Sequence, residues 1–177
     1  GRVIPNNSAV FDIFPSVRMN SHYEADPSAP NAGRFRNEHP DVLIGRPDEV
    51  FPTGSMRWGI RTGLDYTHQA VRAHMAAIIN ELFESFDVDG VEMDFMRHPT
   101  FFKIEDAYAN RYLMTDLVRR VRRRMDEVSS VTGRSIDLAV RVPPTLADSA
   151  RIGLDVKQWM AEDLVDIVIA GGGFIPF

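Results

Sequence analysis

The fold is decided by the stretch Asp89-Gly90-Val91-Glu92-Met93-Asp94, in which acidic and apolar side chains alternate. Successive side chains of a β-strand point to opposite faces, so this alternation predicts a strand. Glu92 and Asp94 would share one face of it, and the apolar side chains between them would share the other. Asp89 and Gly90 favour a turn that enters the strand, with the Asp89 carboxylate capping backbone groups.

Strand-like and helix-like segments alternate on both sides of this stretch. Runs of β-branched and aromatic residues predict strands over 11–19, 88–95, 135–142 and 164–170. Apolar side chains at helical spacing predict helices over 68–86, 108–131 and 155–162. This order favours parallel strands joined by right-handed helical crossovers, and therefore an α/β fold. The run 164–170 is almost wholly apolar, which is typical of a strand buried on both faces.

The expected helices carry recognisable end signals. Thr67 precedes the first of them and fits its N-cap, and Asp155 fits the N-cap of the third. Gly133 follows the second helix, where a residue with a left-handed backbone often ends a helix.

Two α/β architectures have this order of elements, the doubly wound sheet and the (β/α)8 (TIM) barrel. The sequence lacks the glycine-rich turn that a nucleotide-binding sheet places after a strand, and polar residues follow the strands instead. Barrel enzymes carry their chemistry at such strand ends. Four strands make about half a barrel, because a complete one needs roughly 250 residues. We expect residues 1–177 to form a single partial barrel domain, truncated at both ends, with 24–57 as a long inserted loop.

The composition is that of an ordinary globular domain, with 44% hydrophobic and 25% charged residues. No apolar run is long enough to cross a membrane, and a net charge of −5 gives no reason to expect a nucleic acid as partner. The basic run at residues 119–124 is interrupted by Val121 and favours a solvated helix face. The chain has no cysteine, which excludes disulfides and thiolate metal sites. No cofactor is expected.

The two carboxylates of the central strand are the main candidates for catalysis. Asp94 lies nearer the carboxyl end of the strand, where a substrate would bind, and Glu92 lies one layer deeper. Glycosidases typically use two carboxyl groups roughly 5 to 9.5 Å apart on either side of the scissile bond. Asp65 is the best partner within this chain, and a partner on further strands is an equal alternative. The competing interpretation is an internal ion pair with Arg141 or Arg18.

Other polar and aromatic side chains fall at the same predicted edge and suit the binding of sugar hydroxyls and rings. The candidate substrate-binding residues are Asn20, His22, Arg97, His98, Arg141, Tyr66 and Trp58. A metal held by His22, His98 and Asp94 is conceivable, but no metal-binding spacing supports it, so no metal ligand is expected.

Several motifs resemble the barrel proteins called glycosyl hydrolase-like family 10. They are residues 64–72 (LDYTHQAVR), 86–99 (FDVDGVEMDFMRHP) and 155–166 (DVKQWMAEDLVD), and residues 18–22 (RMNSH) further resemble a bacterial subgroup of that family. The resemblance implies a TIM barrel of which this chain covers about strands three to six, a carbohydrate substrate, and a location outside the cytoplasm. Asp94 matches the strand-end aspartate of the family, whereas Glu92 replaces a histidine that is common there.

A second resemblance, to the family 18 chitinases, concerns the same strand. Those enzymes carry a glutamate as general acid at the position of Met96. A methionine cannot donate a proton, so the chitinase mechanism is not expected.

We expect a glycoside hydrolase acting on a poly- or oligosaccharide, with Asp94 as nucleophile or base. The partners expected are this carbohydrate and the remainder of the barrel, supplied by sequence outside the chain. Two alternatives stay open, a barrel that binds carbohydrate without cleaving it and a metal-dependent hydrolase.

Overall fold

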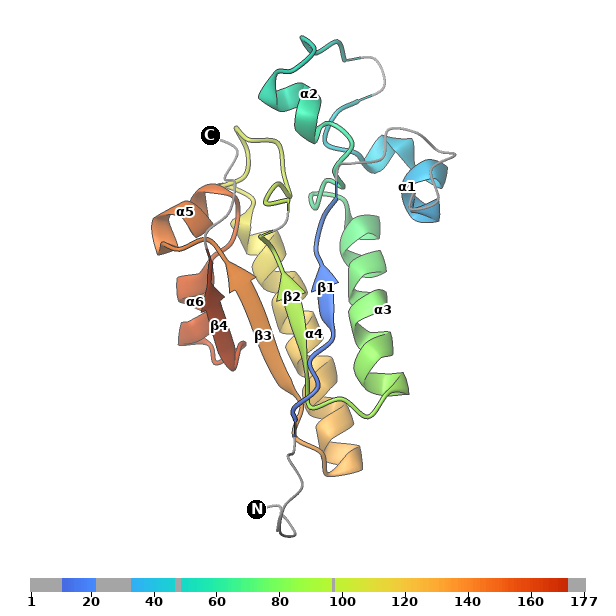
Figure 1. Ribbon diagram of the computed structural model, residues 1–177, viewed down its shortest axis with the longest axis vertical. Coiled ribbons are helices and arrows are strands. Elements are labelled where there is room, and N and C mark those ends of the chain that lie inside the picture. Colours follow the sequence, from blue (N-terminus) through green and yellow to red (C-terminus); the bar gives the residue numbers. More distant parts are fainter. Residues whose placement is uncertain (1–10, 22–32, 47–48, 97, 172–177) are drawn as a thin grey trace.

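The computed structural model describes residues 11–21, 33–46, 49–96 and 98–171 (Figure 1). Four strands alternate with helices along the chain. The strands are β1 (Ser16–Arg18), β2 (Gly90–Asp94), β3 (Asp137–Val142) and β4 (Ile167–Ala170). The helices are α1 (Arg34–Glu38), the 3-10 turn η1 (Pro40–Val42), α2 (Met56–Ile60), α3 (Gln69–Ser85), α4 (Arg111–Thr132), α5 (Leu146–Arg151) and α6 (Val156–Ala161).

The strands form one parallel sheet in the order β1-β2-β3-β4, which confirms the α/β class and the parallel pairing. Ser16 pairs with Glu92, and Asp94 pairs with Arg141. β1 is shorter than the predicted strand 11–19, but backbone hydrogen bonds continue beyond it: Glu92 N–H donates to the Pro15 carbonyl, and Met19 N–H donates to that of Asp94. The carboxyl ends of all four strands therefore meet at one edge of the sheet.

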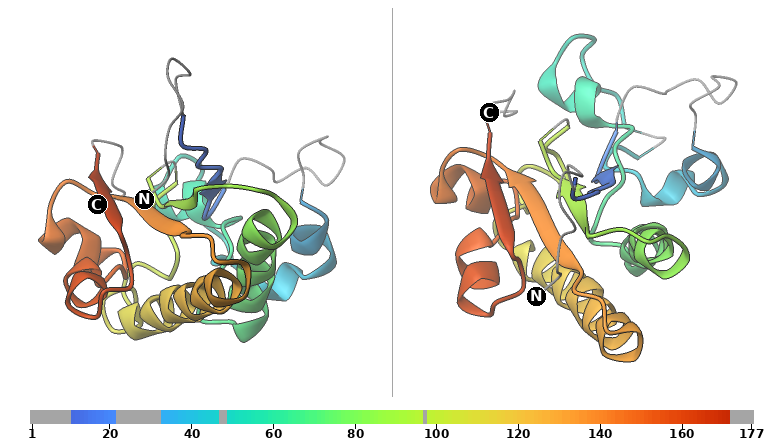
Figure 2. Two further views of the ribbon diagram at one scale, coloured as in Figure 1. Left: turned by 90° about the horizontal axis from the view of Figure 1, so that it is seen from below. Right: turned by 60° about the horizontal axis from the view of Figure 1, so that its bottom comes forward.

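The described helices α3, α4 and α6 cover one face of this sheet (Figure 2). Val91 and Met93 of β2 face them and are fully buried in the hydrophobic core, together with Phe83 of α3 and Val121 of α4. Burial of such apolar surface contributes about 25 cal/mol per Å², so the amphipathic helices are held to the sheet mainly by this face. The opposite face carries Glu92 and Asp94, because strand side chains alternate.

The amino end of the uncovered face is closed by an aromatic ring. The ring of Phe14 lies where a Cβ atom at Gly90 would stand, so that only a glycine leaves room for it. The Asp89 carboxylate accepts the Ile13 N–H at 2.9 Å, which confirms its predicted role in capping backbone groups. These contacts hold the segment before β1 against the start of β2.

The helix ends agree with two of the three predictions. Gly133 caps α4 with a left-handed φ of 69°, and the Asp155 side chain accepts the Gln158 N–H at the start of α6. The prediction for Thr67 is wrong, because the N-cap of α3 is His68 and has no capping side-chain bond. Instead the Asp65 carboxylate accepts both the N–H and the hydroxyl of Thr67, at 2.8 and 2.7 Å.

Two further expectations are corrected. The described parts of 24–57 are not a featureless loop, since α1, η1 and the start of α2 lie there and Val42 and Ile44 are buried. The strand β4 is not buried on both faces: Ile167 is 40% exposed and Val168 38%, because β4 is the edge of the described sheet and nothing described covers its outer side.

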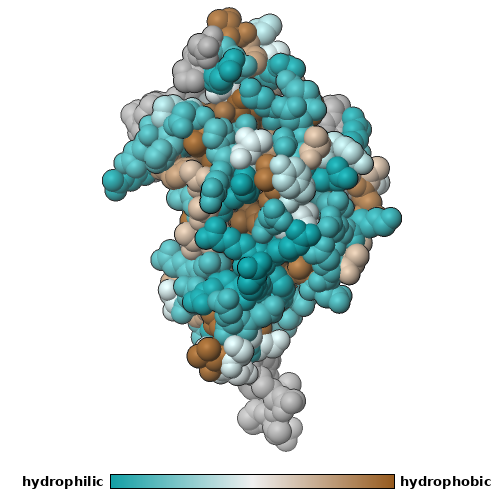
Figure 3. All heavy atoms as spheres, turned by 180° about the vertical axis from the view of Figure 1, so that it is seen from behind, coloured by the Kyte–Doolittle hydropathy of each residue, from teal (hydrophilic) through white to brown (hydrophobic). Residues whose placement is uncertain are grey.

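The outer surface of α4 is hydrophilic (Figure 3). Three of its arginines form ion pairs with carboxylates at 2.6 to 2.7 Å, Arg119 with Glu162, Arg122 with Asp166 and Arg124 with Glu84. The hydrogen bond from Arg119 lowers the pKa of the Glu162 carboxyl to about 2. The basic run is thus a solvated helix face, as predicted. Within the described residues, no helix has the length and apolar character needed to cross a membrane.

Candidate functional site

Asp94 ends β2 at the carboxyl edge of the uncovered face. Its Oδ1 accepts the Met96 N–H at 2.9 Å and lies 3.9 Å from Nε of Arg141. The side chain is 20% exposed. Within the described residues no hydrogen bond engages Oδ2, so this oxygen is open to a ligand. The turn at Met96 therefore orients one oxygen of the carboxylate and leaves the other available.

Glu92 lies deeper on the same face and is held by a cation. Its Oε1 accepts a hydrogen bond from Nε of Arg141 at 2.6 Å, and its side chain is 12% exposed. This bond, and to a lesser degree the charge of Asp94, raises the pKa of the Arg141 guanidinium. The internal ion pair that stood as the competing interpretation is thus observed for Glu92. Arg141 is 39% exposed, and its Nε lies 3.9 Å from Oδ1 of Asp94.

Asp65 is buried, with 5% exposure, and its bonds to Thr67 are those of a turn. The Asp65 N–H donates to the Val42 carbonyl, which fixes its backbone as well. These contacts give Asp65 a structural role in the turn before α3. Within the described residues its side-chain hydrogen bonds go to Thr67 and its N–H bonds to Val42, not to the carboxylates of β2, so its contacts give no support to its assignment as the second catalytic carboxylate.

Asn20 and Tyr66 connect the loops that leave the sheet. The Asn20 amide donates to the carbonyls of Leu64 and Thr100 at 2.9 and 2.6 Å and accepts the N–H groups of Leu64 and Ser21. Tyr66 is fully buried, its hydroxyl donates to the Met19 carbonyl, and burial raises the pKa of that hydroxyl. Both side chains are occupied by the protein itself, so they shape the edge of the site and do not face a substrate.

The remaining candidates are distributed around this edge. His98 is 5% exposed and lies within the loop after β2. Trp58 is 39% exposed on α2, where the Arg61 guanidinium lies 4.2 Å from its ring centre. His22 and Arg97 lie outside the described residues. Within the described ranges no cluster of three histidine, aspartate or glutamate side chains could hold a metal ion.

Sequence reasoning missed two hollows. One lies over the amino end of β3 and is lined by Asp137 and Asp166, with burial, followed by the charge of Asp166, raising the pKa of Asp137. The other lies between α2 and the loop after β2, and Arg57, Lys103 and Phe51 line it. Each is assembled from separated segments, so no local pattern in the sequence marks it. The second lies at the edge where Asp94 ends its strand.

No protein-family model matches the chain, and no curated protein matches it. The interpretation of the site therefore depends on its own geometry.

Proposed function

We propose that this chain is about half of a (β/α)8 barrel and hydrolyses glycosidic bonds of a poly- or oligosaccharide. The sheet supports the architecture, since its strands are parallel, follow one another in chain order and carry described helices on one face only. In a barrel the uncovered face would point to the axis, and its carboxyl edge would form the mouth where substrates bind.

The observation that carries the proposal is that the two carboxylates of β2 differ in their ion pairing and exposure. Glu92 is bonded to Arg141 at 2.6 Å, whereas Asp94 is partly exposed at the edge with one oxygen open. Asp94 then either attacks the anomeric carbon as nucleophile or, as base, takes a proton from the water that attacks this carbon, while a general acid protonates the leaving oxygen. The ion pair of Glu92 and Arg141 holds two charges in fixed positions beside Asp94. These charges need no rearrangement during the reaction.

A carbohydrate-binding barrel without hydrolysis is the second candidate, and Asp65 favours it. Hydrolysis needs a second carboxyl group, and the contacts of Asp65 are those of a turn. The hydrolase proposal therefore requires that residues beyond the described ones supply the general acid.

The test is a panel of soluble poly- and oligosaccharides incubated with the full-length protein, with products detected by mass spectrometry. The proposal predicts shorter products from at least one glycan and their loss on Asp94→Asn. Binding of a glycan without any cleavage would overturn the hydrolase and support the binding barrel. Cleavage that stops on chelation and returns with a divalent metal would support the metal-dependent alternative instead.

A further inference from the structure

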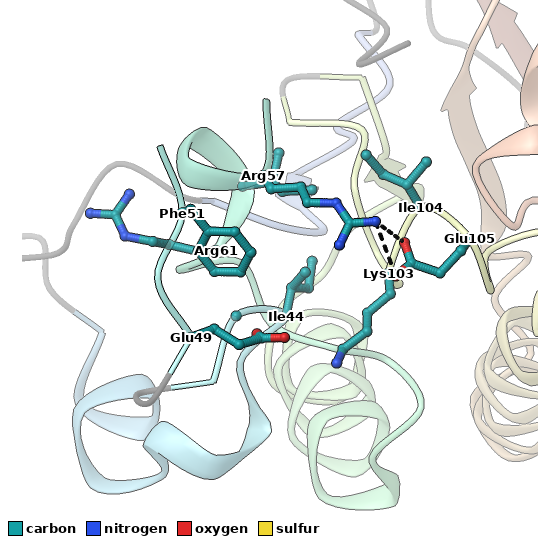
Figure 4. Close-up of a pocket in the computed structure, with 10 residues that line it drawn as sticks. Ile44, Glu49, Phe51, Arg57, Arg61, Lys103, Ile104 and Glu105 are labelled. Atoms are coloured by element: carbon teal, nitrogen blue, oxygen red, sulfur yellow. Dashed lines mark hydrogen bonds and ion pairs between the residues drawn. The ribbon is translucent and has the colours of Figure 1, made fainter. Parts of the chain in front are cut away.

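The pocket between α2 and the loop after β2 is lined by apolar and charged side chains (Figure 4). It is a shallow hollow that is open to solvent. Its apolar lining residues are Ile44, Ile60, Ile104 and Phe51, and its charged lining residues, which we call the rim, include Glu49, Arg57, Lys103 and Glu105.

The residues that line the pocket belong to the two chain segments that follow β1 and β2. The segment with Ile44 is tied to Gly63 by a backbone bond of 2.8 Å, and the Asn20 amide joins Leu64 to Thr100, three residues before Lys103. The Tyr66 N–H donates to the Phe101 carbonyl at 2.8 Å. These buried bonds fix the pocket relative to the carboxyl edge of the sheet, on which Asp94 lies.

The rim residues named above are two acidic and two basic side chains, and the ion pair between Arg57 and Glu105 is long. Arg57 contacts both carboxylate oxygens of Glu105 at 3.3 Å, longer than the 2.7–2.9 Å of a strong ionic hydrogen bond, and both side chains are half exposed. The Glu49 carboxylate accepts the Arg46 N–H. Lys103 makes no ion pair within the part of the chain that the structure describes, and the Arg61 guanidinium points away from the pocket. Such a rim offers both donors and acceptors without selecting an anion.

We infer that this pocket is an accessory subsite for one neutral sugar unit of the carbohydrate substrate. Vicinal hydroxyls both donate and accept, so they suit the carboxylate of Glu49 and the cations of Arg57 and Lys103 together. The apolar face of a sugar ring suits the ring of Phe51, which lines the pocket. This inference rests on the proposed carbohydrate function and extends the binding site beyond Asp94.

The test measures binding by calorimetry to the full-length Asp94→Asn protein, which does not consume its ligand. The probes are neutral gluco-, xylo- and manno-oligosaccharides of increasing length, together with oligogalacturonate. Phe51→Ala and Lys103→Ala should each raise Kd for a long neutral oligosaccharide about 3- to 10-fold, as expected for one lost contact. Monosaccharides should show no such difference.

Two matched controls lie outside the pocket. Val50→Ala changes the 95% exposed neighbour of Phe51, and Lys157→Ala removes an exposed lysine of α6. Both should leave Kd unchanged. Equal affinities for pocket and control variants, a preference for oligogalacturonate, or no binding of any probe would each overturn the subsite. Binding through the pocket by a protein that cleaves nothing would overturn the hydrolase and leave the subsite standing.

Discussion

At the scale of single residues, Arg141 separates the roles of the two carboxylates on β2. Its Nε is 2.6 Å from Glu92 and 3.9 Å from Asp94, so the buried carboxylate is neutralised and the exposed one is not. A buried charge that loses its partner costs more than the pair contributes, because its desolvation is then uncompensated. As long as Glu92 is charged and buried, Arg141 is therefore needed for stability as well as being part of the site.

Arg141→Ala should lower the free energy of unfolding by about 1–3 kcal/mol, since Glu92 would stay buried with an uncompensated charge. Urea unfolding of the variant measures this. The double variant Arg141→Met, Glu92→Met should recover most of the loss, because neither charge is then buried. A double variant as unstable as Arg141→Ala would show that the ion pair is not the cause.

Gly90→Ala should destabilise the protein by about 1–3 kcal/mol through overpacking. The new methyl group would meet the Phe14 ring and lie 2.6 Å from the Asp137 carbonyl oxygen. Thermal unfolding measures the loss. Adding Phe14→Ala should restore only part of it, because the carbonyl contact belongs to β3. Gly33→Ala, where nothing lies within 4 Å, is the matched control, and an equal effect there would contradict the account.

At the scale of single residues, the sequence predicted which side chains share a face of the strand better than it predicted their hydrogen-bond partners. Alternation in β2 was enough to place Glu92 and Asp94 on one face, and Asp89 was correctly interpreted as a capping residue. The hydrogen bonds of Asn20 and Tyr66 were not predicted, because their partners at Leu64, Thr100 and Met19 lie 44 to 80 residues away in sequence. A sequence pattern cannot show whether a polar side chain already has a protein partner.

At the scale of elements, one buried side-chain hydrogen bond connects α6 with α4. Trp159 is fully buried, and its Nε1–H donates to the hydroxyl of Thr115 at 2.9 Å. The Trp159 ring also packs against Phe95 directly after β2, with ring centres 5.6 Å apart. This contact joins α6 to the base of the loop that carries the site.

Thr115→Val should cost about 1–3 kcal/mol, because it keeps the shape of the side chain but leaves the indole N–H without an acceptor. Chemical denaturation followed by tryptophan fluorescence measures this. Thr132→Val is the matched control, since Thr132 is exposed at the end of α4 and bonds only to local backbone groups. Equal losses in the two variants would refute the role of the Trp159 bond.

The contact of α1 with α3 should depend on pH. The His74 ring stacks on Phe35 with ring centres 4.1 Å apart, and burial, followed by the charge of His39, lowers the pKa of His74 below 6.5. The folded state then binds the proton less readily than the unfolded state. Stability is full above pH 6.5 and falls as the pH decreases toward the lowered pKa.

His74→Gln should therefore reduce the loss of stability between about pH 7 and about pH 5. Unfolding midpoints in urea at the two pH values measure it, with His68→Gln as control. An unchanged pH dependence in His74→Gln would contradict the stacking account.

The long helices α3 and α4 could be predicted, as could the short α6, whose start Asp155 marks, but α1, α2 and α5 could not. α3 and α4 are 17 and 22 residues long and show several turns of apolar periodicity. α1, α2 and α5 are 5 or 6 residues long, so they contain too few turns for a period to appear. Their stability comes from packing against the rest of the chain, which the local sequence does not display.

At the scale of the whole molecule, the central feature is a parallel sheet with described helices on one face. Parallel sheets are normally covered on both faces, and here the second face carries Glu92, Asp94 and Arg141. The order of elements predicted the parallel sheet correctly. It did not predict the exposure of Ile167 and Val168, because the burial of β4 depends on what pairs with its edge.

The most direct test of the central claim is the ratio of kcat/KM between Asp94→Asn and a matched control in the full-length protein. Asp163→Asn makes the same chemical change at an exposed residue before β4, whose φ of 51° asparagine tolerates. On a glycan that the wild-type protein cleaves, Asp94→Asn should lower kcat/KM by about 10²- to 10⁴-fold with an intact fold, and the control should leave it unchanged. Equal kcat/KM values in the two variants would contradict the assignment of Asp94.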